Sequence, residues 1–152
     1  MLVSACLLGE PVRYDGRSAE CAHPVLLRWL REGRVVPLCP EVAGGLTVPR
    51  PPAELVGLRA VTIAGDDVTA AFERGARAAV ELAREAGVIA AVLKDGSPSC
   101  GSTWVYNGTF CGTRRTGLGL TAEHLREYGI PVFNEASLDA ADAYLHGRRK
   151  QA

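Results

Sequence analysis

Five cysteines are the residues of this sequence most capable of unusual chemistry. They stand at positions 6, 21, 39, 100 and 111, and no two of them form a C-x-x-C pair. An odd number at wide spacing is unlike the even, closely spaced set of a small disulfide-stapled secreted domain. A free cysteine is often only a small buried apolar side chain, so each one must be judged by the element that carries it.

A pattern of helix, glycine and β-branched strand recurs along the chain. Helices are predicted over 24–32, 69–86 and 121–128, and strands over 34–38, 88–94 and 130–134. Two more apolar runs, 2–8 and 59–64, also predict strands, and a last helix is expected from Ser137 to near His146. Alternating strands and helices indicate a parallel sheet. We therefore predict an α/β fold: a single three-layer domain over residues 1–147, Rossmann-like with a mainly parallel sheet, followed by a basic tail at 148–152.

Three of the cysteines fall at the ends of predicted strands. Cys6 ends the first strand, Cys39 directly follows strand 34–38, and Cys100 lies in the loop after strand 88–94. Ligands of open α/β sheets bind outside the carboxyl ends of the strands. We therefore expect these three side chains to converge at that edge. Cys21 and Cys111 lie elsewhere, and we expect them to be bystanders.

Three thiolates at one place favour soft-metal chemistry: an iron–sulfur cluster, zinc or copper(I). Pro40 follows Cys39, as a proline often follows a ligand cysteine in iron–sulfur loops. Small residues surround Cys100 and allow backbone amides to approach a cluster. Three protein ligands also leave one metal coordination position open, which distinguishes a catalytic metal site from a structural one.

Glu41 and two serines are polar candidates near these cysteines. Glu41 lies two residues after Cys39, and apolar surroundings would raise its pKa toward the range useful for acid–base catalysis. The alternative is a helix-start carboxylate at the surface. Ser97 and Ser99 flank a proline before Cys100, where a hydroxyl can position substrate or water, or simply form the turn.

Charged residues in two other loops are candidates for binding. Arg13 and Asp15 in the first loop can orient a polar substrate, although Asp15-Gly16 is equally a turn signal. Arg114 and Arg115 lie in a glycine-rich stretch before a predicted helix, where they can hold an anion or form only a connector. A small hairpin over 104–111 is predicted to turn at Asn107-Gly108.

The composition excludes several classes of function. Lys and Arg number 17, as do Asp and Glu, so the formal net charge is zero. Zero net charge argues against nucleic-acid binding driven by counterion release and against a polybasic membrane patch. No apolar run approaches the roughly 20 residues of a membrane helix. The start of the chain lacks the basic residues of a signal peptide, so we expect a cytoplasmic protein.

The motifs together resemble a known family, the domain-of-unknown-function family 523, which resembles the desulfidase domain of bacterial thiouracil desulfidases. In chain order they are SACLLG from Ser4, VRYDG from Val12, CPE from Cys39, GGL from Gly44, PR from Pro49, SPSCG from Ser97 and GTF from Gly108. The resemblance covers nearly the whole chain.

This resemblance implies a [4Fe–4S] cluster held by Cys6, Cys39 and Cys100, with a fourth iron free to bind the sulfur of a thiocarbonyl. It also implies a non-redox reaction in which water replaces the sulfur of a thiouracil-like pyrimidine and sulfide is released. Glu41 and Ser97 match residues that serve proton transfer and substrate placement in the family. The alternative is a non-catalytic module that holds a cluster, zinc or a persulfide as a sensor or sulfur carrier.

Overall fold

The computed structural model describes the backbone of residues 1–151 and the side chains of residues 1–148. A four-stranded parallel sheet with the order β2-β1-β5-β8 forms its centre. Its strands are β1 (Leu2–Ser4), β2 (Val36–Leu38), β5 (Ala91–Leu93) and β8 (Val132–Asn134). Because β1 lies between β2 and β5, the chain first builds the sheet in one direction from β1 and then in the other. Ligands of open α/β sheets bind at such a switch point.

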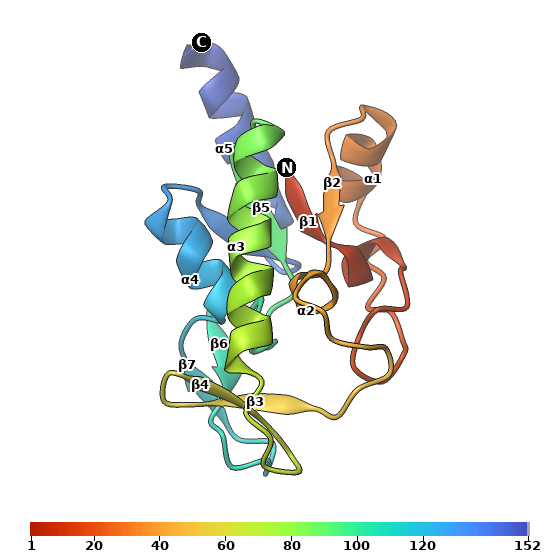
Figure 1. The fold of residues 1–152 in the computed structure, drawn as a ribbon. Coiled ribbons are helices and arrows are strands. Elements are labelled where there is room, and N and C mark those ends of the chain that lie inside the picture. The colour runs from red at the N-terminus through yellow and green to blue at the C-terminus, as the bar shows by residue number, and fades with distance from the viewer. Residues whose placement is uncertain (152) are drawn as a thin grey trace.

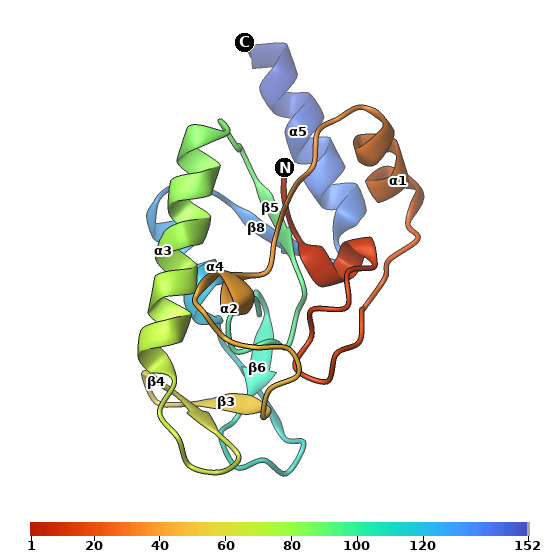
Figure 2. The ribbon, with the colours of Figure 1, turned by 45° about the vertical axis from the view of Figure 1, so that its right-hand side comes forward.

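Helices cover both faces of the sheet, which confirms the predicted three-layer α/β architecture (Figures 1 and 2). One face carries α1 (Pro24–Arg31) and α5 (Leu138–Gln151), and the other carries α3 (Thr69–Glu85) and α4 (Leu120–Glu127). Among the residues described, no helix is long and apolar enough to span a bilayer.

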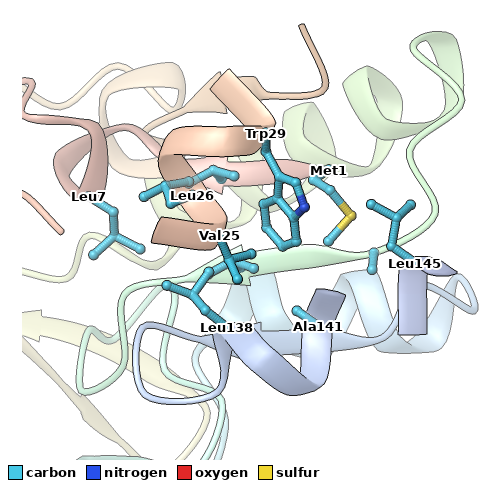
Figure 3. Close-up of a cluster of buried hydrophobic side chains, with 11 residues drawn as sticks. Met1, Leu7, Val25, Leu26, Trp29, Leu138, Ala141 and Leu145 are labelled. Carbon is cyan, nitrogen blue, oxygen red and sulfur yellow. The ribbon is translucent and has the colours of Figure 1, made fainter. Parts of the chain in front are cut away.

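Trp29 is the largest side chain of the core between the sheet and the pair α1 and α5. Figure 3 shows it among Leu26, Leu138 and Leu145, which come from both helices. Its ring is fully buried, and its indole N–H donates to Asp142 Oδ1 at 3.0 Å. Burying each large apolar side chain contributes on the order of 1.5–3 kcal/mol, so this cluster fixes α1 and α5 against the sheet.

Two element ends differ most from those expected. The first strand stops at Ser4, and the next residues form a 3₁₀ helix, η1 (Ala5–Leu8), which turns Cys6 out of the sheet. The last helix, α5, continues through Gly147 to Gln151 and does not end near His146. Most of the expected basic tail is therefore helical, and Ala152 lies outside the described residues.

Two antiparallel hairpins lie beyond the carboxyl ends of the parallel strands (Figure 1). One pairs β3 (Ala53–Val56) with β4 (Arg59–Thr62), so the predicted strand 59–64 exists but lies outside the parallel sheet. The other pairs β6 (Trp104–Tyr106) with β7 (Arg114–Thr116). The predicted turn at Asn107-Gly108 is wrong, because Asn107 Oδ1 accepts the Thr109 N–H and the chain returns only at Arg114.

A short helix, α2 (Pro40–Ala43), lies directly against the backbone of α3. A Cβ atom at Gly44 would lie 2.0 Å from a backbone oxygen of α3, and one at Gly75 would lie 2.0 Å from a backbone oxygen of α2. Only glycine allows so close an approach. Because Cys39 is the N-cap of α2 and Glu41 lies in its first turn, this contact sets where both side chains stand.

Replacing Gly75 with alanine should force α2 away from α3. We expect the free energy of unfolding to fall by roughly 1–3 kcal/mol, the usual cost of overpacking. Gly147 is the matched control, because it also lies in a helix and a Cβ there meets no atom within 4 Å. Gly147→Ala should raise stability by about 0.5–1 kcal/mol. Urea unfolding checks both, and a Gly75→Ala protein as stable as wild type would contradict the close contact.

Candidate active site

Three cysteines line one cavity at the carboxyl edge of the parallel sheet. Cys6 lies in η1 directly after β1, Cys39 follows β2, and Cys100 lies in the loop after β5. Their cavity has a volume of about 400 Å³. One water molecule takes roughly 30 Å³ in the liquid, so the cavity has room for a group much larger than a single ion. The predicted convergence of these three residues is confirmed.

Burial raises the pKa of all three thiols. That of Cys6 rises to about 11, first because of burial and second because of the neighbouring Cys39. Burial also raises the pKa of Cys39, although backbone N–H groups at the start of α2 oppose the shift. Cys100 is the deepest, and burial raises its pKa despite the Ser4 hydroxyl that donates to its sulfur. Raised pKa values favour the protonated thiols, and any metal bound by them has to displace those protons.

The arrangement of the thiols fits an iron–sulfur cluster. Within the part of the chain whose side chains are described, no three His, Cys, Asp or Glu residues gather closely enough to hold a single metal ion. The three cysteines are instead distributed around the wall of a wider cavity. Thiolates are the preferred ligands of iron–sulfur clusters. The donor set and the size of the cavity both fit a cluster of several atoms.

Glu41 lines the same cavity, as its position after Cys39 predicted. Its side chain is 16% exposed and lies 3.4 Å from the Nε of Arg50, which is itself only 5% exposed. Arg50 is fixed in turn by its bonds to the carbonyl oxygens of Val12, at 3.0 Å, and Thr47, at 3.1 Å. Burial raises the pKa of Glu41, and Arg50 partly offsets the shift. A carboxyl group in this state can exchange protons with a bound water.

Asp95 fixes the loop that carries Ser97 and Cys100. Its Oδ1 accepts backbone N–H groups from Gly96, Ser102, Thr103 and Trp104, at 3.1, 2.9, 3.1 and 3.4 Å. Its Oδ2 accepts the Thr103 hydroxyl and the amide of Asn134, the latter at 3.2 Å. Burial alone would raise the pKa of Asp95, but these hydrogen bonds, led by Thr103, hold it below its ordinary value.

Ser97 lines the cavity and also closes a turn. Its Oγ accepts the backbone N–H groups of Ser99 and Cys100, both at 3.1 Å. A hydroxyl also carries one hydrogen that it can donate. Ser97 therefore keeps a donor available while its position is fixed by the backbone of Cys100.

Two of the expected substrate-binding residues do not line the cavity. Ser99 is fully buried, and its hydroxyl pairs with the Thr121 hydroxyl at 2.8 Å. Asp15 is exposed and accepts the backbone N–H of Arg17 at 3.0 Å. It therefore forms a turn, the alternative to substrate binding that the Asp15-Gly16 pair also indicated. Arg13 does line the cavity. Of this set, only Arg13 stands where it can reach a ligand beside the cysteines.

Ser4 was missed in the sequence and connects two strands to the deepest cysteine. Its buried Oγ accepts the backbone N–H of Lys94 at 2.9 Å and donates to Cys100 Sγ at 3.5 Å. The sequence does contain a signal for Ser4, which is a polar residue at the end of an apolar strand. A hydroxyl buried there needs hydrogen-bond partners.

Lys94 was also missed. Its ammonium donates to the carbonyl oxygen of Asp95 at 2.9 Å and to Glu135 Oε1 at 3.2 Å. Lys94 lines the cavity, and its charge and that of Arg13 lower the pKa of Cys6 against the effect of burial. The two cations therefore favour a thiolate at Cys6, and Glu135 partly opposes them.

The arginines expected to bind an anion stand in β7, away from the start of α4. Arg114 lies over the ring of Trp104, 3.9 Å from its centroid, and Arg115 is exposed. Neither lines the cavity with the cysteines. Both arginines thus belong to a strand and not to a glycine-rich loop, and anion binding near them stays a prediction.

Cys21 and Cys111 are not among the residues that line the cavity, although Cys111 stands between two that do, Phe110 and Gly112. Cys21 is partly buried and packs against the apolar cluster around Trp29. Cys111 is exposed, and its thiol lies 3.3 Å from the carbonyl oxygen of Thr109.

Comparison with known proteins gives three consistent matches. Residues 1–137 match the model of a family described as 2-thiouracil desulfurase. The chain is 40% identical over 149 residues to the uncharacterized protein YbbK of Bacillus subtilis (strain 168), covering 91% of this chain and 97% of the relative. A solved structure, the [4Fe-4S]-dependent thiouracil desulfidase TudS, is 51% identical with a TM-score of 0.95, covering 96% of this chain and 97% of that one.

Replacing Asp95 with asparagine should weaken the cavity loop. The amide nitrogen cannot accept the bonds that reach Oδ2, so we expect a loss of roughly 1–3 kcal/mol in the free energy of unfolding at pH 7. Because folding lowers the pKa of Asp95, its stabilising effect is complete above the ordinary aspartate pKa and is lost as the pH falls through the folded value.

Urea unfolding of wild type and Asp95→Asn at several pH values between 7 and 3 measures this effect. The difference in stability should shrink toward the acid end of that range. Asp66→Asn, at an exposed aspartate, should cost little at any pH. An Asp95→Asn deficit that stays constant down to pH 3 would mean that the charge of Asp95 does not contribute.

Proposed function

The chain belongs to the 2-thiouracil desulfurase family, and on this premise we propose that it is an iron–sulfur-dependent desulfidase. It removes sulfur from a thiouracil-like pyrimidine by non-redox replacement with water, which gives the oxo product and sulfide. The observation that carries this proposal is one cavity lined by Cys6, Cys39, Cys100 and the buried carboxyl group of Glu41. The 51% identity to TudS supports the same reaction and the same type of cofactor.

We assign the three cavity cysteines as the ligands of a [4Fe–4S] cluster. When bound, such a cluster supplies a soft Lewis acid at the iron without a protein ligand, which polarises a thiocarbonyl toward attack by water. The chain contributes one cysteine for each of three irons, and Lys94 and Arg13 stand nearby to balance charge. Ser4 and the loop anchored by Asp95 hold Cys100 in place.

We assign Glu41 as the group that takes the proton of the attacking water. It lies in the cavity wall, and its carboxyl group is buried and oriented by Arg50. A raised pKa brings a carboxylate closer to the proton affinity that this transfer requires. Ser97 donates its free hydroxyl hydrogen toward the substrate, since its oxygen is already occupied by two backbone N–H groups. Arg13 offers a further donor to a polar ring substituent.

The three ligand cysteines should each be required for cluster binding. After anaerobic reconstitution with iron and sulfide, wild type should show iron–sulfur absorption and four irons per chain, and should release sulfide from 2-thiouracil. Cys6→Ala, Cys39→Ala and Cys100→Ala should each lower iron content and abolish sulfide release, because a cluster with one protein ligand fewer is labile.

Cys21→Ala and Cys111→Ala are the matched controls and should keep both cluster and activity. Unchanged iron uptake in all three cavity variants would defeat the ligand assignment. A loaded wild-type protein that releases no sulfide from either 2- or 4-thiouracil would favour the non-catalytic sensor or carrier instead.

Glu41→Gln should separate proton transfer from cluster binding. Glutamine keeps the size of the side chain but cannot take a proton, so we expect kcat for 2-thiouracil to fall by about 100-fold or more. Iron content should equal that of wild type. Glu73→Gln, at an exposed glutamate of α3, should leave kcat unchanged. A Glu41→Gln enzyme with wild-type kcat would remove Glu41 from the mechanism.

A further inference from the structure

Glu54 is a second buried carboxylate in the cavity wall, and the mechanism above does not use it. It lies in β3, is 9% exposed, and lines the cavity together with the cysteines. Its Oε1 accepts two backbone N–H groups from the loop after β6, from Gly108 at 3.0 Å and from Phe110 at 3.2 Å. Among residues 1–148, no Lys, Arg or His forms an ion pair with it.

The other carboxylate oxygen of Glu54 has no partner among the side chains and backbone groups of residues 1–148. This oxygen is also absent from the fully enclosed polar atoms that lack a hydrogen bond. Because Glu54 lines the cavity, this oxygen is available as an acceptor to a ligand bound there. A carboxylate oxygen accepts hydrogen bonds, so a ligand that supplies an N–H can pair with it.

Phe110 is held beside Glu54 in an unusual backbone conformation. Its φ is 57°, and among the described residues it is the only non-glycine residue with positive φ. Bulky side chains rarely adopt this region, and such strain persists where the surroundings impose it. Here the Phe110 N–H is tied to Glu54 Oε1, and Phe110 lines the cavity. One carboxylate thus fixes the loop that brings an aromatic residue to the cavity.

We propose that Glu54 and Phe110 recognise the ring of the substrate, and that they select a planar cyclic thioamide with a ring N–H beside the thiocarbonyl. The free oxygen of Glu54 accepts that N–H, and the ring of Phe110 packs against the face of the heterocycle. This inference rests on the proposed function, since it names the substrate class of the same cavity. On this proposal, Glu54 and Phe110 in the hairpin region determine substrate specificity. The residues around Cys6, Cys39 and Cys100 carry out the reaction.

The chemistry of the two contacts sets the size of the effect. A hydrogen bond to a charged acceptor changes affinity by about 10-fold or more, and stacking of a base on an aromatic ring contributes a similar factor. Both contacts are made to the unreacted parts of the ring, so they should affect KM and leave kcat largely unchanged.

Glu54→Gln tests the hydrogen bond on the cluster-loaded protein. Glutamine can keep its oxygen on the two backbone N–H groups, but it presents an N–H₂ donor where the free oxygen stood. Anaerobic calorimetry with uracil and with 1,3-dimethyluracil, which lacks ring N–H groups, measures binding independently of turnover. Wild type should bind uracil about 10-fold or more tightly than the dimethyl compound, and Glu54→Gln should lose this preference.

A purely structural role for Glu54 gives a different result, because Glu54→Gln would then weaken both compounds equally. That outcome would overturn the proposal. So would a wild-type protein that does not distinguish the two compounds or binds neither, and so would a variant that keeps the preference. In the same preparations, KM for 2-thiouracil should rise about 10-fold in the variant.

Phe110 variants test the second contact separately and do not depend on Glu54→Gln folding. Phe110→Leu should weaken uracil binding and raise KM by about 10-fold, whereas Phe110→Tyr should retain both, because stacking needs an aromatic ring. Equal behaviour of Phe110→Leu and wild type would remove Phe110 from recognition. Failure of wild type to release sulfide would count against the proposed function alone, since uracil binding is read independently.

Discussion

A parallel sheet brings the ends of all its strands to one edge, and the cavity depends on this constraint. Here β2, β1 and β5 are neighbours, and each is followed by one of the cysteines Cys39, Cys6 and Cys100. The paired strands therefore bring three cysteines from distant parts of the chain to one cavity. The order of the strands matters as much as their direction, because β1 lies where the sheet is built both ways.

Buried polar groups then convert approximate convergence into fixed positions. Asp95 binds the loop that carries Cys100, Ser4 connects that cysteine to the end of β5, and Arg50 orients Glu41. Each of these groups is satisfied within the protein, so the site does not have to be ordered by its ligand. The glycine contact between α2 and α3 has the same effect on Cys39. The reactive end of the cavity is preorganised by contacts that do not themselves react.

The sequence predicts the strand-end cysteines and Glu41, because their positions follow from local patterns of strand and helix. It does not predict Ser4 or Glu54, whose roles come from partners 96 and 54 to 56 residues away. The position of Ser99 beside a site residue does not fix its direction, because its hydroxyl is held by a buried partner, the Thr121 hydroxyl. The turn of the hairpin that begins at Trp104 differs from the prediction for a related reason. Glu54 accepts the N–H groups of Gly108 and Phe110, and these long-range bonds override the local turn signal at Asn107-Gly108.

The carboxylate of Asp95 also has a consequence for the way the molecule opens. It holds the amide protons of Ser102 and Thr103, and it is joined to β8 through Asn134. Those amides can exchange with solvent only when this network breaks. The loop should therefore exchange its amide protons at the rate of the central strands and not at the rate of a surface loop. The loop that carries Cys100 therefore opens together with the central sheet, as part of one cooperative unit.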